Sequence, residues 1–561
     1  TGAAPPPASP STLQAAFHAA AHEWGVPEPV LLAVAYNLTR WEHHGGAPST
    51  GGGYGIMYLT AADDLVTMGG KGEGIIGQAR PRVPGLHALD DAAALTGVYR
   101  ETLKHDPAQN IRGGAALLAH YARETVGGVP QDSAAWYGAV ARYSDARNAM
   151  TARSFAETVF QTINTGVTRT IGTGEIVTLA PLAVAPDRST MDMDGLDVGA
   201  MQTVPADCPA DLQCQFIPAA YELNNPDDPT DYGNYDVADR AQTGPAIRYI
   251  VIHDTEISYD TTIRAFQNPA SYVSTHYVLR SSDGEVTQMV ENKDVAWGAG
   301  NWYINMHSIN IEHEGIAIEG AAWYGEPLYR SSARLVRYLA DKYGVPLDRA
   351  HILGHDDLPG PLPANHAAMH WDPGPFWDWA HYMELIGAPV ASTSDTANTN
   401  VVTINPPWAT NQPPVTYCLD TGCRDVPRQS ASFVYMYTAP SFDAPTIDDP
   451  ALPGPGSTEA YDWGNKAAVG QQFYRVAKQG DWDAIYFGGQ LAWFHNPGHA
   501  STALPGSGAL ITPAPGLEEI PVYGRAYPEA SAYPEGIDAQ SIVPLQYTIP
   551  AGQVYVATEL V

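Results

Sequence analysis

The sequence predicts a multidomain protein with an α-helical N-terminal domain, a central α/β domain and an all-β C-terminal region. Its 561 residues are the length of about three domains. Apolar residues recur at helical spacing near the N-terminus, follow alternating strands and helices in the middle, and form short alternating runs at the Gly-, Pro- and Tyr-rich end. Hydrophobic residues make up 44% of the chain, which is enough for several packed cores and excludes global disorder.

The first domain is predicted to be helical over residues 1–165. Leu13, Phe17 and Ala20 have the spacing of one helix face, and the apolar run 30–36 continues the pattern. Residues 166–215 are rich in Thr, Gly, Pro and Asp around short apolar stretches. We therefore expect this segment to be a linker.

The central domain is predicted over residues 216–390, with a mixed sheet flanked by helices. IRYIVIHDT and SINIEHEGIA have the composition of buried strands, and STHYVLR and EVTQMV flank Ser282-Asp283-Gly284 as the two arms of a hairpin. SSARLVRYLADKYG is predicted to be an amphipathic helix that ends at Gly344.

The C-terminal region is predicted to be all-β over residues 415–561, after a Ser/Thr/Asn/Pro-rich linker at 391–414. A short pattern, Gly-Gln-x-x-Tyr-x-Val-Ala, begins at Gly470 and returns with one residue fewer at Gly552. Two small barrels related by duplication would explain this pattern.

The charge balance excludes some partners. The formal net charge is −32, whereas a nucleic-acid-binding surface must be basic to gain from counterion release. The same balance argues against an anionic membrane surface, and no apolar run reaches the roughly 18 residues that a membrane span needs. We expect a soluble, acidic monomer without nucleic-acid partners or membrane insertion.

Four cysteines form two close pairs, Cys208 with Cys214 and Cys418 with Cys423. Neither pair has a partner pair at the spacing of a four-cysteine zinc site. Two local disulfides in a secreted protein are the favoured interpretation, and four free thiols in a cytosolic protein are the alternative. The opening TGAAPPPASP contains no signal peptide, which is typical of a mature exported chain.

Histidines and carboxylates lie on, or directly after, several of the predicted strands. They are His253, Glu312, Glu314 and His355, and then His366, His370 and Asp372 in HAAMHWDPGP. A catalytic zinc site needs three N or O ligands and one open position for water, and two imidazoles with one carboxylate meet that need. Ligands at the ends of separate strands are also rigidly held. The alternative is that each histidine is an ordinary core or surface residue.

Residues 245–387 resemble the type-2 N-acetylmuramoyl-L-alanine amidases, which share a fold with the peptidoglycan-recognition proteins. The matching stretches, in the family's order, are YIVIHDT, STHYVLRSSDGEVTQMV, VAWGAGNW, NMHSINIEHEG, HILGHDDLPG and MHWDPGPFWDW. The resemblance implies Zn²⁺ held by His253, His355 and Asp372. It also implies a catalytic Glu312 and a site histidine at His276.

Three departures from the family pattern bear on the site. His370 stands where a lysine is common, so a histidine would donate to the oxyanion. Trp297-Gly298-Ala299-Gly300 lacks the histidine of a Trp-His-Ala-Gly motif. The stretch from His355 to Asp372 is long, which leaves His366 or His370 as alternative ligands to His355. Trp297, Asn301 and Trp302 are expected to contact substrate.

The resemblance implies a cell-wall-associated enzyme that hydrolyses the bond between N-acetylmuramic acid and L-alanine, with peptidoglycan as its partner. Glu314 shares a strand face with Glu312 and has a supporting role in this interpretation. The alternatives are a non-catalytic peptidoglycan-binding protein and a glycosidase with the central domain as an accessory.

The flanking regions resemble two further families. Residues 26–60 resemble the start of a lysozyme-like transglycosylase domain, but Leu38 stands where the general acid should be, and Glu42 lies one turn later. The stretch GDWDAIYFGGQLAWFHNP is similar to bacterial Src-homology-3-like cell-wall domains. Aromatic residues of this C-terminal region, Tyr474, Trp482, Tyr486 and Trp493, are predicted either to bind the wall or to form a barrel core.

Overall fold

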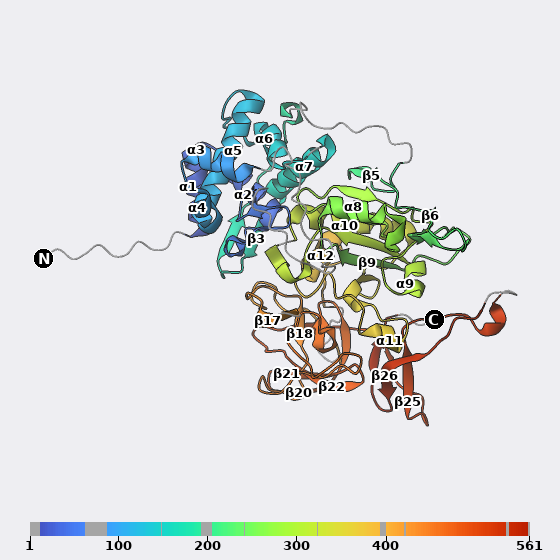
Figure 1. Ribbon diagram of the computed structural model, residues 1–561. Coiled ribbons are helices and arrows are strands. Elements are labelled where there is room, and N and C mark those ends of the chain that lie inside the picture. The colour runs from blue at the N-terminus through green and yellow to red at the C-terminus, as the bar shows by residue number, and fades with distance from the viewer. Residues whose placement is uncertain are drawn as a thin grey trace.

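The computed structural model has a helical, an α/β and a β-rich part, in the predicted chain order (Figure 1). It describes residues 12–61, 87–146, 148–191, 205–240, 242–322, 324–392, 400–419, 422–533 and 538–558. Within these ranges no helix is both long enough and apolar enough to cross a membrane. Parts of both predicted linkers, 192–204 and 393–399, lie outside the described residues.

The N-terminal domain packs its helices around one apolar core. The helices are α1 (Leu13–Trp24), α2 (Glu28–Thr39), α3 (Ala88–Thr96), α4 (Arg100–His105), α5 (Pro107–Val126), α6 (Tyr137–Tyr143) and α7 (Ala149–Thr165). The Thr12 hydroxyl caps the start of α1, and Gly25, at φ +72°, ends it in the left-handed conformation that glycine adopts without strain.

The segment predicted as a linker at 166–215 begins instead with a hairpin of β3 (Val167–Thr170) and β4 (Ile176–Leu179). Val177 and Leu179 are buried in the helical core, and their neighbours along β4 are exposed. This two-residue alternation is short, which is why composition alone favoured a linker. The hairpin extends the N-terminal domain.

The central domain is built on a six-stranded mixed sheet. Its strand order is β14 (Ile352–Gly354), β9 (Tyr249–Asp254), β13 (Ser308–His313), β10 (Tyr277–Leu279), β11 (Val286–Gln288) and β5 (Cys214–Phe216). The first four strands are parallel, and β11 runs antiparallel to β10, as the predicted hairpin requires.

Alternation along β9 and β13 separates a helix-covered face from a polar face. Ile250, Ile252, Ile309 and Ile311 pack in the same core as residues of α10 (Glu326–Tyr343) and α12 (Trp379–Ile386). The residues between them, which include His253, Asn310 and Glu312, point to the opposite face. The polar residues of both strands therefore meet on one side of the sheet.

The C-terminal region contains a five-stranded sheet. Its order is β22 (Gln490–His495), β21 (Trp482–Phe487), β20 (Gln472–Gln479), β15 (Val401–Ile404) and β23 (Ala503–Pro505). Strand β15 lies inside the segment predicted as a linker at 391–414. All four of its residues are buried, so this short apolar run joins the sheet instead of connecting domains.

The two copies of the repeated pattern begin alike and pack differently. Gly470 and Gly552 both have positive φ, at 85° and 83°, and each precedes a strand, β20 or β27 (Tyr555–Ala557). Strand β27 pairs only with β24 (Ala509–Ile511) among the described strands, next to a ribbon of β25 (Glu519–Tyr523) and β26 (Pro544–Pro550). The duplication into two barrels stays a prediction.

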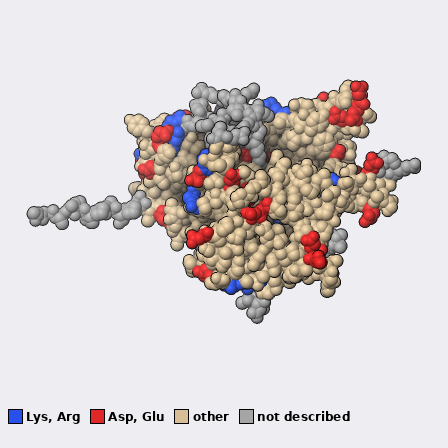
Figure 2. Space-filling view, turned by 60° about the horizontal axis from the view of Figure 1, so that its bottom comes forward, with Lys and Arg blue, Asp and Glu red and all other residues tan. Residues whose placement is uncertain are grey.

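Both predicted disulfides are present. Cys208 bonds Cys214, the first residue of β5, and Cys418 bonds Cys423 across the hairpin of β16 (Thr416–Leu419) and β17 (Gly422–Asp425). The acidic side chains in Figure 2 form several separate groups over one face, with fewer basic side chains between them.

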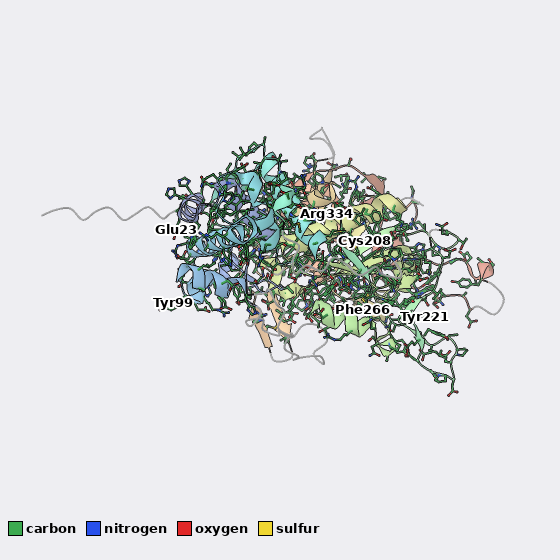
Figure 3. The ribbon with its side chains drawn as sticks, turned by 90° about the horizontal axis from the view of Figure 1, so that it is seen from above. Glu23, Tyr99, Cys208, Tyr221, Phe266 and Arg334 are labelled. Carbon is green, nitrogen blue, oxygen red and sulfur yellow. A yellow bond between two sulfur atoms is a disulfide. The ribbon has the colours of Figure 1, made fainter. Side chains whose placement is uncertain are left out.

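The N-terminal and central domains are joined by polar contacts between α7 and α10. Arg334 on α10 contacts the hydroxyl of Ser154 and donates to Thr158 Oγ1 at 2.9 Å. Figure 3 places Arg334 where the N-terminal helices meet the central domain, far from Glu23 and Tyr99 on their outer side.

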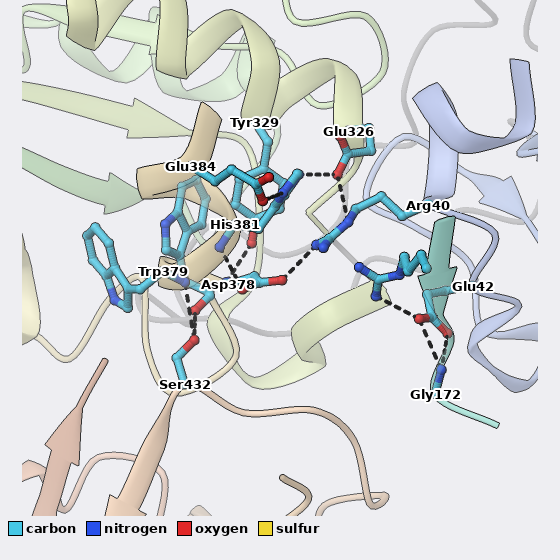
Figure 4. A network of polar contacts seen from close by, with 12 residues as sticks. Arg40, Glu42, Gly172, Glu326, Tyr329, Asp378, Trp379, His381, Glu384 and Ser432 are labelled. Atoms are coloured by element: carbon cyan, nitrogen blue, oxygen red, sulfur yellow. Dashed lines mark hydrogen bonds and ion pairs between the residues drawn. The ribbon is translucent and has the colours of Figure 1, made fainter. Parts of the chain in front are cut away.

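A second contact reaches the start of α12 (Figure 4). Arg40 Nη1 donates to Asp378 Oδ2 at 2.7 Å, and Glu326 lies 3.8 Å from Arg40 Nε. The next residue, Trp379, donates its N–H to Ser432 Oγ in the C-terminal region at 3.2 Å. One short segment of the central domain therefore contacts both neighbours.

Candidate metal centre and active site

Two histidines and one aspartate converge at the carboxyl end of the parallel strands. His253 lies near the end of β9, His355 directly follows β14, and Asp372 lies in the loop before α12. Because β9 and β14 are parallel neighbours, their carboxyl ends meet at one edge of the sheet. All three side chains are buried.

The spacing of the three side chains fits a tetrahedral metal ion. His253 Nδ1 lies 3.0 Å from His355 Nδ1, and the two atoms lie 3.4 Å from Asp372 Oδ2 and Oδ1, respectively. Zinc–ligand bonds of about 2.0–2.2 Å at tetrahedral angles separate the ligand atoms by about 3.3–3.5 Å. Two imidazole nitrogens that face each other at 3.0 Å also need a cation or a proton between them.

Asn310 orients His253 for this role. The Nε2–H of His253 donates to Asn310 Oδ1 at 3.0 Å, which leaves the Nδ1 lone pair directed at the cluster. Gly298 stands at the position where the family motif carries a histidine. A Cβ atom there would lie 3.1 Å from Asn310 Cγ, so the Asn310 side chain packs directly against this position. Sequence reasoning missed Asn310, although its two-residue spacing from Glu312 was a usable signal.

The two imidazoles have opposite pKa shifts. Burial lowers the pKa of His253, but Asp372 and Glu312 outweigh burial and raise it above its usual value. Burial, together with the charge of His253, outweighs Asp372 and lowers the pKa of His355 to about 4. The Asp372 and Glu312 carboxylates therefore favour a positive charge at the cluster. His355 Nε2 is buried without a hydrogen-bond partner in the part of the chain that is described.

Glu312 lies directly opposite His253 in the strand register, and its side chain is half-buried. Glu314 has a different place: its carboxylate accepts the Tyr259 N–H at 3.0 Å and the N–H and hydroxyl of Ser281 at 2.9 and 2.8 Å. Glu314 therefore holds α8 (Tyr259–Phe266) to the end of β10. These three hydrogen bonds support the fold around the site.

The other two histidines of the cluster sequence lie apart from each other. The His370 side chain is 61% exposed, with its ring centroid 5.0 Å from that of His355. His366 is buried, and its Nδ1 accepts the Gly360 N–H at 2.8 Å. The convergent set within the described residues is thus His253, His355 and Asp372.

His276 is buried beside Asn310 and is not part of the metal cluster. Its side chain is fully buried, its Nδ1 accepts the Asn310 N–H at 3.0 Å, and its Nε2 lies 2.7 Å from Arg240 Nη2. Burial, followed by the charge of Arg240, lowers its pKa well below the usual value. His276 is therefore neutral and supports the strand that carries Asn310.

The predicted substrate-contact residues divide into exposed and buried ones. Trp297 and Trp302 both donate their indole N–H to Asp236 Oδ2, at 2.8 and 2.9 Å, and Trp302 is 48% exposed. Asn301 is buried, and its amide donates to the carbonyl oxygens of Pro359 and Gly524. Asp236, which the sequence did not single out, fixes both indoles.

Leu38 and Glu42, at and near the expected general-acid position of the N-terminal domain, are enclosed by other residues. Leu38 is buried, and the Glu42 carboxylate accepts from Arg169 Nη2 at 2.8 Å and from the Gly172 N–H at 3.1 Å. The cavity beside them measures about 50 Å³, and Tyr324 of the central domain forms part of its wall.

Known proteins share the central domain. The sequence profile of the N-acetylmuramoyl-L-alanine amidase family matches residues 243–375. N-acetylmuramoyl-L-alanine amidase A of Achromobacter lyticus is 32% identical over 174 residues, which cover 28% of this chain and 90% of that protein. The 1,6-anhydro-N-acetylmuramyl-L-alanine amidase AmpD of Escherichia coli K12 is 33% identical over 117 residues, covering 20% of this chain and 58% of AmpD.

Solved structures of amidases also match part of the chain. The E. coli amidase AmiD, in complex with an anhydro-N-acetylmuramic acid tripeptide substrate, is 21% identical with a TM-score of 0.23, and the match covers 32% of this chain and 69% of AmiD. The sequence relatives carry the assignment, because one of them is matched over nine-tenths of its length. The chain belongs to the N-acetylmuramoyl-L-alanine amidase family.

Proposed function

We propose that the protein is a peptidoglycan hydrolase that cleaves the amide bond between N-acetylmuramic acid and the L-alanine of the stem peptide. The observation that carries this proposal is the convergence of His253, His355 and Asp372 on the same sheet face as Glu312, in a chain of the amidase family. The ligand set and the nearby carboxylate are what metal-assisted amide hydrolysis needs.

The metal we propose is zinc, held by His253 Nδ1, His355 Nδ1 and an Asp372 oxygen. Two nitrogens and one carboxylate leave a fourth position open, as in catalytic zinc sites. When bound there, zinc would supply a Lewis acid that polarises the amide carbonyl and lowers the pKa of a bound water to near 7.

Glu312 is the proposed general base. Its carboxylate accepts the proton of the attacking water and returns it to the leaving amine of L-alanine. The strand holds it opposite His253, so its distance to the cluster does not depend on a flexible loop. His370, the exposed imidazole beside the cluster, is placed to donate to the oxygen that becomes negatively charged.

The rim of the site would contact the rest of the substrate. Trp302, pinned by Asp236 and half-exposed, offers an aromatic face, and Trp297 shares the same anchor. His276 and Asn301 keep these strands and loops in place through their buried hydrogen bonds.

The flanking regions are proposed to bind the wall without chemistry of their own. The small cavity beside Leu38 and the three hydrogen bonds that hold the Glu42 carboxylate support a lysozyme-like domain that has lost its general acid. The β-rich end would anchor the protein as Src-homology-3-like domains do. The two disulfides support secretion to the cell wall.

Mass spectrometry of digested peptidoglycan tests the activity. Free stem peptides with an N-terminal L-alanine are expected from the wild-type protein. Released disaccharides would instead indicate a glycosidase, and no release at all would indicate a binding protein.

The variant Glu312→Gln tests the base. It should keep one equivalent of metal by elemental analysis and lose more than about 10²-fold in turnover. Glu291→Gln is the matched control, because Glu291 is an exposed carboxylate of the same domain that pairs with Lys293. Wild-type turnover in Glu312→Gln would show that another group takes the proton.

A further inference from the structure

A cavity of about 300 Å³ lies between the central domain and the C-terminal region, next to the segments that carry His355 and Asp372. Its central-domain wall includes Asp356, which follows His355, and Trp371, which precedes Asp372. The opposite walls come from the C-terminal region, including Trp463 and Tyr547. The amidase profile ends at residue 375, so most of the residues that line this cavity lie outside the family domain.

Aromatic rings surround a buried imidazole in this cavity. The ring of His366 lies 5.4 Å from that of Tyr547 and 6.2 Å from that of Trp463, both edge-on. Pockets of this size that combine aromatic walls with a few polar groups bind small organic ligands or single units of a polymer.

His366 offers the cavity a hydrogen-bond donor. Its Nδ1 accepts the Gly360 N–H at 2.8 Å, so the proton of the neutral ring is on Nε2. Burial lowers the pKa of the ring, which keeps it neutral. His366 is 6% exposed, and no hydrogen bond to its Nε2 is made within the described ranges.

Asp449 offers an acceptor on the other side. The Tyr547 hydroxyl and the Ala451 N–H both donate to its Oδ1, at 2.6 and 2.8 Å, so Oδ2 is the oxygen available to a ligand. Lys466, which also lines the cavity, donates to the backbone carbonyl oxygens of Glu459 and Asp462. The cavity therefore favours a neutral ligand with hydroxyl groups over an anion.

We propose that this cavity is a subsite for one N-acetylhexosamine unit of the glycan strand whose muramoyl amide lies at the metal cluster. The inference rests on the proposed function. Asp449 accepts from a sugar hydroxyl, His366 Nε2 donates to the acetamido oxygen, and Trp463 packs on the apolar face of the ring. The C-terminal region thus contributes to substrate binding directly at the catalytic domain.

The first test measures sugar binding without turnover. The β-1,4-linked dimer of N-acetylglucosamine contains no muramoyl amide, so its affinity for the full chain can be followed by tryptophan fluorescence. Trp463→Ala and His366→Asn should each weaken binding by about tenfold. Asn keeps an acceptor near the Nδ1 position for Gly360 and removes the Nε2–H donor. Trp24→Ala, at a half-buried tryptophan of the N-terminal domain, should bind as the wild type does.

The second test compares two substrates. For each protein, kcat/KM is measured on glycan strands of several disaccharides and on a muramoyl peptide with a single sugar. The ratio of the two values should fall about tenfold in both cavity variants, through KM, and stay constant in Trp24→Ala.

If Trp463→Ala and His366→Asn bind the dimer as tightly as the wild type does, the subsite is wrong. An equal loss of kcat/KM on both substrates would also overturn it, because a purely structural role predicts that result. Weakened binding of the free stem peptide in place of the dimer would also overturn it. A wild-type protein that cleaves neither substrate contradicts the proposed function instead, and dimer binding then still decides whether the cavity takes a sugar.

Discussion

Removing the charge of Arg40 should loosen the N-terminal domain from the central domain. Arg40 pairs with Asp378 at 2.7 Å, and the side chains are 17% and 4% exposed. Burial lowers the pKa of the guanidinium, but Asp378 and Glu326 outweigh it and raise the pKa, so Arg40 is charged. At an effective dielectric constant of about 20, two unit charges at 2.7 Å attract by about 6 kcal/mol before desolvation is subtracted.

The variant Arg40→Met keeps most of the aliphatic volume of the side chain. It leaves the buried carboxylates of Asp378 and Glu326 without the positive charge of Arg40. Breaking a buried pair from one side typically costs about 3–5 kcal/mol. Arg112→Met is the matched control: Arg112 pairs with Glu23 at the same 2.7 Å, but with 28% and 44% of the side chains exposed. An exposed pair of this kind contributes about 0–1 kcal/mol.

Differential scanning calorimetry of the full chain measures both variants. We expect Arg40→Met to lower the first unfolding transition by several degrees and Arg112→Met to leave it nearly unchanged. The double variant Arg40→Met/Asp378→Asn should recover part of the loss, because Asn still caps α12 and the buried charge at position 378 is removed. Equal effects of the two arginine variants, or full additivity in the double variant, would refute the reasoning.

Three further predictions concern the central domain. Glu314→Gln should keep its metal but lower stability by about 1–3 kcal/mol, measured by thermal unfolding, since its carboxylate accepts three buried hydrogen bonds. Burial raises the pKa of Glu326, but His381, Arg330 and Arg40 outweigh it and lower the pKa from 4.5 to about 2. Ionised Glu326 therefore contributes about 3 kcal/mol to the free energy of unfolding, fully above pH 4.5 and less and less as pH falls towards 2. The difference in melting temperature between the wild type and Glu326→Gln should disappear over that pH range. Reduction of Cys208–Cys214, whose partners are six residues apart, should cost about 2 kcal/mol in the same assay.

The candidate site was predictable where local periodicity determines it. Alternation along β9 and β13 places His253 and Glu312 on one face, and a short strand before His355 brings it to the same edge. Local spacing also paired the cysteines correctly.

What could not be predicted depends on contacts between distant parts of the chain. Arg40 meets a residue 338 positions away, and no local pattern marks a lone arginine after a helix as an interface residue. His276 matched a site motif, but its burial depends on Arg240, which reaches it from a loop. Strand β15 has only four residues, too few for periodicity to separate it from a linker.

The loop that carries Asp372 connects the metal cluster to both flanking regions. Pro375 accepts the Ser432 N–H at 2.9 Å, and Trp379 donates to the hydroxyl of the same serine. Asp378, between them, binds Arg40 of the N-terminal domain. Deleting residues 391–561 would therefore remove backbone partners of the ligand loop together with any wall-binding surface, so lost wall binding after truncation would not show anchoring. Point variants in the full chain separate the two effects, because a surface substitution at a C-terminal aromatic leaves Ser432 and the ligand loop in contact.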